Sequence, residues 1–259
     1  ARTVLNEVRP VKRVALVVYA SNSSLCGGFN ANVIRLLQHV VDEYAELGKE
    51  NIVIYPIGRK VAEKAVKMGL NVAGDFTALA EKPNANDCIT IARELGEKFI
   101  SGEYDRVEMI YHHFKSAGSQ ILTRKPFLPI DIEEELKRDH ERDLTSNVIT
   151  KKAQEYIKRK EEERTSEHKE AVPLNDNFLV EPDMNTVLTK LIPKYLHLMV
   201  YTALLDSIAS EHAARMVAMQ TATDNADEIL RELNLQYNKS RQQAITSELL
   251  DIVGGSVNN

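Results

Sequence analysis

Residues 194–253, KYLHLMVYTALLDSIASEHAARMVAMQTATDNADEILRELNLQYNKSRQQAITSELLDIV, dictate the architecture of this chain. The stretch contains neither glycine nor proline over sixty residues, and it is rich in alanine, leucine, glutamate, glutamine and methionine, which favour helices. It therefore predicts one continuous helix, about 90 Å long at 1.5 Å per residue. A compact domain built from the rest of the 259 residues is too small to cover a helix of that length.

A heptad pattern runs along the second half of this helix. Apolar or small residues recur at alternating steps of four and three: Met219, Thr223, Ala226, Leu230, Leu233, Tyr237, Ser240 and Ala244. This spacing is typical of a coiled coil. Because helices gain most of their stability from packing, the stripe needs a partner. Three arrangements could cover the stripe: a bundle formed by the chain itself, pairing with a second copy of the chain, or pairing with a helix from another segment or subunit.

The first 130 residues show a different pattern, in which short apolar runs of strand length alternate with amphipathic stretches of helix length. Such an alternation predicts an α/β fold, and we expect a Rossmann-like layered domain with a mixed sheet, followed by one very long C-terminal coiled-coil helix. We assign residues 1–130 to the α/β domain and 184–259 to the long helix and tail. The strands are expected at Val14–Tyr19, Ile52–Ile57, 106–114 and 120–128, and the helices at 33–47, 59–68 and 86–100.

Two segments separate the domain from the long helix. More than half of residues 131–170 are Asp, Glu, Lys or Arg, with both signs interspersed, which predicts a solvated helical insertion and not a nucleic-acid patch. Residues 171–183 are predicted to return to the sheet as a strand, centred on Phe178–Val180.

Composition excludes several classes of function. The net charge of -5 gives no electrostatic reason to bind nucleic acid or an anionic membrane surface. No apolar run approaches the length needed to span a bilayer. The two cysteines, Cys26 and Cys88, lie far apart in sequence, which fits a reducing compartment better than a disulfide framework.

Two stretches resemble one known family. Residues 23–30, SSLCGGFN, lie between a predicted strand and a helix and resemble the Leu-Cys-Gly-Gly-Phe-Asn signature of the gamma subunits of rotary F-type ATP synthases. Residues 210–226 and 235–255 are similar to the C-terminal shaft helix of that family almost position by position. Three features differ: Asn22-Ser23-Ser24 replaces the usual acidic-basic-glycine sequence, the charged segment is longer, and the family's N-terminal helix is absent before Val14.

The resemblance implies a central rotor stalk that is not an enzyme and carries no cofactor or metal. In the family the N-terminal and C-terminal helices wind around each other, so the missing N-terminal helix is the expected partner of the stripe. The shaft would stand inside a ring of alpha and beta subunits. The α/β domain would form a foot against the epsilon subunit and the membrane c ring, at the cytoplasmic face of a bacterial inner membrane. No nucleic acid is implied, and the isolated chain is expected to self-associate.

The resemblance also implies five partner contacts. Arg241 and Gln242 match family positions that hydrogen-bond loops of the beta subunits, although a solvated helix face would look the same. Arg215, Met216 and Met219 match a second patch of the shaft. For the two methionines, simple coiled-coil packing is the alternative interpretation.

An α/β enzyme is the alternative function. Cys26 could act as a nucleophile, or Gly27-Gly28 could cradle a phosphate at the start of a helix. The chain lacks both the dinucleotide-binding and the P-loop glycine patterns, and a buried, inert Cys26 is the competing interpretation. Adjacent strand residues point to opposite faces, so His112 and His113 are not expected to share a metal ion. A free-standing coiled-coil adaptor, a third class, does not account for the α/β domain.

Overall fold

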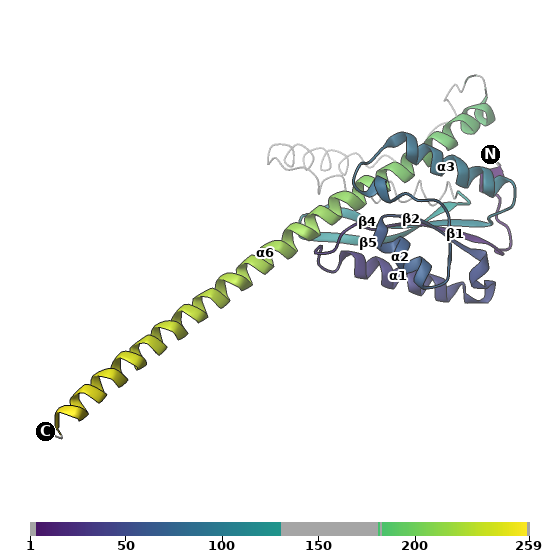
Figure 1. Ribbon diagram of the computed structural model, residues 1–259. Coiled ribbons are helices and arrows are strands. Elements are labelled where there is room, and N and C mark those ends of the chain that lie inside the picture. The colour runs from purple at the N-terminus through teal and green to yellow at the C-terminus, as the bar shows by residue number, and fades with distance from the viewer. Residues whose placement is uncertain (1–3, 131–180, 182, 258–259) are drawn as a thin grey trace, which may run out of the picture.

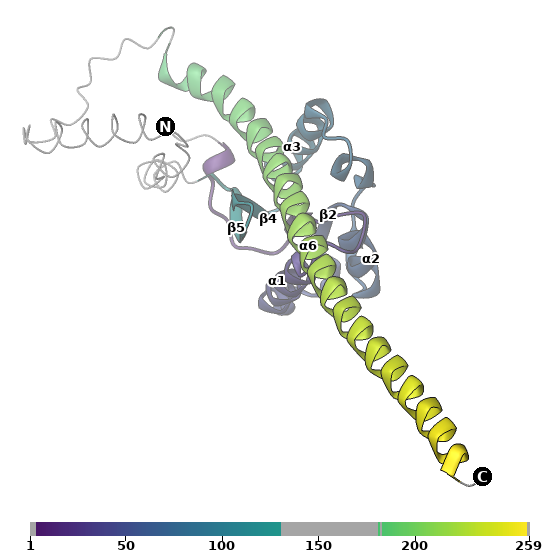
Figure 2. The ribbon, with the colours of Figure 1, turned by 90° about the vertical axis from the view of Figure 1, so that its left-hand side faces the viewer.

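A computed structural model describes residues 4–130, 181 and 183–257. An α/β domain is crossed by a single helix, α6 (Met184–Val257), whose second half projects into solvent (Figures 1 and 2). At 74 residues, α6 is about 110 Å long. The charged segment 131–170 and the predicted strand at Phe178–Val180 lie outside the described residues.

The domain is built on one mixed sheet of five strands in the order β3-β2-β1-β4-β5. The pairs β1–β2, β1–β4 and β2–β3 are parallel, while β4 and β5 form an antiparallel hairpin. The predicted mixed α/β fold is therefore confirmed. The strands are β1 (Val14–Tyr19), β2 (Ile52–Ile57), β3 (Asn71–Val72), β4 (Arg106–Ser116) and β5 (Ser119–Leu128).

Helices cover both faces of the sheet. On one face lie α1 (Phe29–Glu43) and α2 (Arg59–Lys67), and on the other lie α3 (Ala85–Ile100) and the first half of α6 (Figure 1). Strand β1 is completely buried because it lies at the centre of these layers, which accounts for its unbroken apolar sequence. The short 3-10 helices are η1 (Val4–Asn6), η2 (Ala45–Leu47), η3 (Lys49–Asn51) and η4 (Thr77–Ala80).

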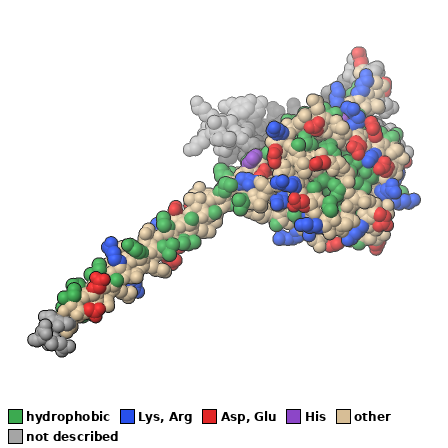
Figure 3. Space-filling view, in the orientation of Figure 1, with side chains coloured by type: hydrophobic (Ala, Val, Ile, Leu, Met, Phe, Trp, Pro, Cys, Tyr) green, Lys and Arg blue, Asp and Glu red, His purple; other side chains and the backbone are tan. Residues whose placement is uncertain are grey.

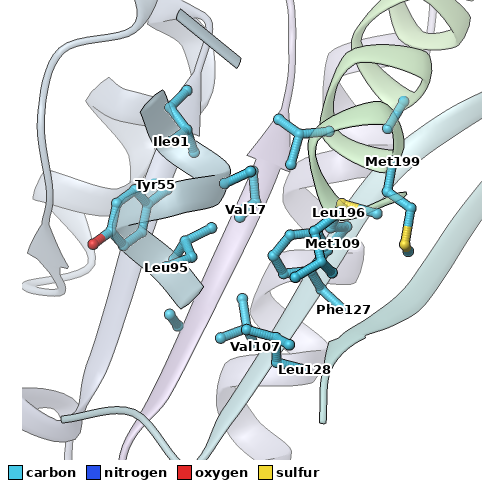
Figure 4. Packing of buried hydrophobic residues seen from close by; sticks show 14 of the residues in the cluster. Val17, Tyr55, Ile91, Leu95, Val107, Met109, Phe127, Leu128, Leu196 and Met199 are labelled. Atoms are coloured by element: carbon cyan, nitrogen blue, oxygen red, sulfur yellow. The ribbon is translucent and has the colours of Figure 1, made fainter. Parts of the chain in front are cut away.

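The first half of α6 is part of the domain core. Leu196 and Met199 pack with Met109 of β4 and Phe127 of β5 in the cluster drawn in Figure 4. Fully burying a side chain of this size contributes about 1.5–3 kcal/mol. The long helix is therefore fixed to the sheet by apolar contact. The members from α6 are Ile192, Leu196, Met199, Val200, Ala203 and Leu204.

Helix α6 continues through Pro193, although proline usually ends or kinks a helix. Pro193 lies inside the helix, where it lacks the N–H that would bond the preceding turn, at a cost of about 3 kcal/mol. The start of the helix is capped, because Asp183 Oδ1 accepts from the Thr186 N–H at 2.9 Å and its Oδ2 from the Thr186 hydroxyl at 2.6 Å. Capping and the burial of Ile192 and Leu196 beside the proline offset that cost.

Candidate functional site

Helix α6 presents two different faces where it crosses the domain. Leu196, Val200 and Ala203 are buried on the sheet side. Leu191 and Leu198 are each 56% exposed, and they lie seven residues apart on the opposite side. A helical residue recurs on the same side after seven positions, so these leucines continue the heptad register of the projecting half.

The exposed heptad positions form one stripe over nearly the whole helix, which we call the outer stripe. It begins about four heptads earlier than the sequence pattern indicated. Residues 191–217 carry apolar side chains on both faces, and those facing the sheet conceal the periodicity of the others. The outer stripe comprises Leu191, Leu198, Leu205, His212, Met219, Ala226, Leu233 and Ser240, together with Thr223, Leu230, Tyr237 and Ala244.

The projecting half of α6 is exposed along its length. Every residue from Met219 to Gly254 is exposed, including Leu230 at 58%, Leu233 at 55% and Tyr237 at 66%. Figure 3 shows apolar side chains along this part of the helix. Such a row of large apolar groups on one helix marks an interaction surface.

In the described part of the chain, hydrogen bonds or ion pairs at Val200, Asp206, Ser210 and Arg215 tie α6 to the domain, and we call this set of contacts the joint. The Tyr19 hydroxyl donates to the Val200 carbonyl at 3.0 Å, and His113 Nδ1 lies 2.7 Å from Asp206 Oδ2. Further along the helix, the Ser210 hydroxyl donates to the carbonyl of His112 at 3.3 Å. The fourth tie is made by the guanidinium of Arg215, described next.

Arg215 brings together the two stretches that carried the family resemblance. Its Nη1 donates to the Ser24 carbonyl at 2.8 Å, its Nη2 donates to Ser23 Oγ at 2.7 Å, and the side chain also pairs with Glu211. The SSLCGG loop is therefore bound to the helix at the place where α6 leaves the domain. Sequence spacing could not reveal this contact, because Ser23 and Arg215 are 192 residues apart.

Leu25 and Gly27 of this loop have positive φ values. Gly27 has φ +57°, in the left-handed region that side chains rarely adopt, which accounts for glycine there. Leu25 has φ 68° and an exposed side chain. The Asn30 side chain holds the loop together, accepting from the Ser21 N–H at 3.0 Å and donating to the Ser23 carbonyl at 3.1 Å.

The other predicted contact residues lie apart from this joint. Met216 and Met219 are exposed, one and four residues beyond Arg215 on the helix. Arg241 and Gln242 lie far along the projecting half and are exposed. The structure thus gives Arg215 partners within the chain and leaves the other four side chains available at the surface.

Cys26 is buried in this loop, where Asn30 Nδ2 lies 3.2 Å from its sulfur. Cys88 is also buried, and that burial raises the pKa of its thiol to about 11. A thiol without access to solvent is protected from reagents. We expect both thiols to react with a small alkylating reagent at least about tenfold more slowly than in the unfolded chain.

Arg215→Ala is expected to accelerate labelling of Cys26 by up to about thirtyfold, since it removes two hydrogen bonds from the loop that contribute about 1 kcal/mol each. Labelling of Cys88, which is remote from the tie, should stay unchanged. Peptide mapping by mass spectrometry measures the two rates separately. Rapid, selective labelling of Cys26 in the unaltered chain would instead support a nucleophilic role.

The two adjacent histidines face different surroundings. His113 pairs with Asp206, whereas the ring of His112 is buried and stacks on Phe29 with ring centroids 4.3 Å apart. The two imidazoles therefore do not converge, as the alternation of a strand requires. Burial lowers the pKa of His112 from 6.5 to about 4.

His112 makes folding stability depend on pH. The unfolded chain takes up a proton on this side chain near pH 6.5, whereas the folded chain takes it up only near 4. The stability present above pH 6.5 is thus lost as the pH falls through this window, by up to about 1.4 kcal/mol per pH unit. We expect His112→Phe to remove about 2 kcal/mol of the loss between pH 6.5 and 5, measured by urea denaturation at both values. Equal losses in both proteins would contradict the assignment.

Comparison with known proteins identifies relatives over most of the chain. The family described as ATP synthase matches residues 1–257. The ATP synthase gamma chain of Phocaeicola vulgatus is 48% identical over 249 residues, covering 96% of this chain and 75% of the relative. That of Bacteroides fragilis is 47% identical over 249 residues, covering 96% and 76%, and that of Flavobacterium johnsoniae is 39% identical over 248 residues, covering 96% and 73%.

Two solved structures share the fold. The central stalk and c-ring structure of the Tetrahymena thermophila mitochondrial ATP synthase contains a chain with TM-score 0.52 and 23% identity, covering 84% of this chain and 80% of its own length. A chain of the Euglena gracilis mitochondrial ATP synthase (OSCP, F1 and c-ring) has TM-score 0.55 and 22% identity, covering 95% and 73%. At these identities the likeness concerns the fold.

Proposed function

The chain belongs to the gamma-chain family of ATP synthases, and from this premise we propose that it is the central rotor stalk, which couples rotation of the membrane c ring to conformational change in the catalytic beta subunits. One observation carries the proposal: a single helix has one half in the core of a domain and the other half projecting, with an exposed stripe. Such a molecule can receive a turning force at the domain and deliver it along the helix.

Mechanical coupling requires that the helix cannot turn within the domain. Apolar packing of Leu196 and Val200 resists displacement of α6 from the sheet. The ties at Val200, Asp206, Ser210 and Arg215 are spaced four to six residues apart along the helix and resist its rotation about its own axis. Together these contacts support a joint that transmits torque from the foot to the shaft.

The shaft needs no bond-making group of its own. Its faces differ, because the outer stripe runs along one side. As the shaft turns, each surrounding beta subunit would meet a different face in succession. A conformation is favoured only to the extent that its contacts differ from those of the alternatives, so an asymmetric shaft can shift each subunit between states. In this proposal the chain is a non-catalytic subunit without a cofactor.

The proposed partners follow from the family. Alpha and beta subunits would surround the projecting half, while the epsilon subunit and the c ring would contact the foot. The complex would lie at the cytoplasmic face of a bacterial inner membrane, with this chain attached peripherally. None of the helices within residues 4–130, 181 and 183–257 combines the length and the hydrophobicity of a transmembrane span.

The outer stripe is proposed to take a helix as its partner. In the assembled enzyme this would be the N-terminal helix that the family places alongside the shaft. In the isolated chain the same surface is exposed, so we propose that two copies associate through it.

Proposed contacts with the beta subunits are Arg241 and Gln242 on the projecting half, and Met216 and Met219 nearer the joint. Polar donors suit a turning surface, because each hydrogen bond contributes only about 1 kcal/mol and can be exchanged for another. Arg215 would contribute to this surface indirectly, by positioning the SSLCGG loop beside it.

The proposal is tested by purifying the tagged chain together with co-expressed alpha and beta subunits. We expect the three to copurify, and loss of either subunit from the purified material would count against the stalk role. In the complete enzyme, Arg241→Ala is expected to reduce ATP-driven proton pumping about fivefold, since the contact contributes about 1 kcal/mol. Lys239→Ala removes another exposed cation, on a different face of the helix, and serves as the matched control. Equal effects of the two substitutions would contradict the contact assignment.

A further inference from the structure

The projecting half of α6 carries charged residues along one side of the outer stripe and none along the other. Two rows of exposed residues border the stripe, and within each row the residues are spaced seven apart. In a pair of helices such rows face those of the partner and set its orientation. The row we call the charged flank comprises Gln220, Asp227, Asn234, Arg241 and Glu248. The row we call the neutral flank comprises Ala222, Ile229, Gln236, Gln243 and Leu250.

Nearer the base of α6, the α/β domain covers the side of the helix that carries the charged flank. Counting back from Gln220 in steps of seven leads to Ala213, Met199 and Ile192, each of which is buried. A partner helix needs access to both flanks of the stripe. Figure 1 shows the domain at one end of α6 only. Pairing through both flanks is therefore confined to the projecting half.

Asp227 and Arg241 carry opposite charges on the charged flank. They are two heptads apart, about 21 Å along the helix, so they cannot contact each other within one chain. Neither forms an ion pair within the part of the chain that the structure describes. Only a second molecule can bring such a pair of charges together.

The orientation of a second copy decides whether these charges meet. In a parallel pair the charged flank of one helix faces the neutral flank of the other, so no ion pair forms between the flanks. In an antiparallel pair each flank faces its own copy. Asp227 can then lie opposite Arg241 of the second copy, and the two-fold symmetry repeats this ion pair.

The charges also select one antiparallel register. A shift of one heptad in one direction would place Asp227 against Glu248 of the second copy, which is repulsive, and a shift in the other direction would place it against Asn234. Pairing Arg241 with Glu248 would move Leu230 beyond the end of the second helix. Only the register that joins Asp227 to Arg241 combines two ion pairs with a long overlap.

The stripe residues fit this same register. Leu230 lies opposite Ser240 of the second copy, and Leu233 lies opposite Tyr237. A large side chain thus meets a small one beside each central layer, as interlocking packing requires. All four side chains are exposed in the single chain.

We propose that two copies of this chain pair in antiparallel orientation through the projecting halves of α6, with Asp227 of each copy against Arg241 of the other. The inference rests on the self-association proposed above and specifies its orientation and register. Because the domain occupies one end of α6, the two domains lie at opposite ends of the pair (Figure 1). The pair covers the outer stripe and Arg241, so it competes with the contacts proposed for the stalk.

Cysteine cross-linking of the full chain tests the orientation and register. Leu230→Cys and Ser240→Cys are prepared as separate variants and oxidised mildly, alone and mixed, and the linked peptides are mapped by mass spectrometry. We expect a linked dimer in the mixture and none in either variant alone, because Cys pairs form only between facing positions. Cys26 and Cys88 are buried and present in every sample.

Each result of the cross-linking experiment has a distinct meaning. Linkage within each variant alone would show a parallel pair and overturn the orientation. A dimer that sediments but does not link in the mixture would overturn the register. A chain that sediments as a monomer would overturn both this inference and the proposed self-association. The stalk role is tested separately, by copurification with alpha and beta subunits.

Exchanging the charges tests the ion pair. Arg241→Asp is expected to weaken the dimer at least about fivefold in sedimentation velocity, because it places two acidic residues opposite each other twice. Adding Asp227→Arg to the same chain restores the pair and should return the affinity to within about twofold. Lys239→Asp makes the same change of net charge away from the flanks and is the matched control. Equal weakening by Arg241→Asp and Lys239→Asp, or no recovery in the exchanged chain, would overturn the proposal.

Discussion

Leu196→Ala is expected to lower the free energy of unfolding by about 2–5 kcal/mol, the usual cost of removing a leucine from a packed core. Leu196 is 3% exposed and belongs to the cluster that fixes α6 to the sheet. The change would weaken the joint itself, so activity of the assembled enzyme should fall together with stability. The chain has nine tyrosines and no tryptophan, so urea denaturation can be followed by tyrosine fluorescence.

Leu198→Ala is the matched control for this prediction. Leu198 lies two residues later on the same helix, but its side chain is 56% exposed on the outer stripe. Its replacement is expected to change the free energy of unfolding of the isolated chain by less than about 0.5 kcal/mol. Equal destabilisation by the two changes would show that the face carrying Leu196 is not what holds α6 to the sheet.

Leu230→Asp and Leu233→Asp are expected to abolish self-association of the isolated chain. Both leucines lie on the outer stripe, and burying such a side chain in an interface contributes about 1.5–3 kcal/mol. Each change should therefore weaken the dimer by roughly tenfold or more, and the double variant should sediment as a monomer. Thermal unfolding of the α/β domain should be unaffected, since the projecting half does not contribute to its core.

Leu235→Asp is the control for the stripe. Leu235 is 65% exposed and lies two residues after Leu233, so it points to another side of the helix. We expect this variant to associate as the unaltered chain does. A monomer in the unaltered chain at high concentration, or equal loss of association in all three variants, would contradict pairing through the outer stripe.

Local sequence patterns predicted much of this architecture. The apolar runs at Val14–Tyr19 and Ile52–Ile57 are strands with those bounds, because buried parallel strands need continuous apolar sequence. The absence of glycine and proline predicted the long helix. The predicted range, 184–259, already included Pro193, which the helix accommodates because tertiary packing there outweighs a local preference against helix.

The contacts that form the joint could not be predicted from the sequence. Asp206 and Ser210 look like ordinary polar positions of a solvated helix, and only the fold places them against His113 and His112. Arg215 was singled out by resemblance, but its partners in the SSLCGG loop follow from the path of α6 across the sheet. Long-range contacts of this kind depend on topology, which periodicity does not encode.

The attachment of α6 to the sheet also provides a helical nucleus for the projecting half. Starting a helix in water is unfavourable, whereas extending one is nearly neutral for each residue added. The turns between Leu196 and Ser210 are held by the domain, so residues beyond them only extend an existing helix. We therefore expect fraying to begin at the far end, with amide hydrogen exchange slowest at the base and fastest towards the C-terminal end of α6. The projecting half of α6 is therefore expected to bend more easily the farther a residue lies from the sheet.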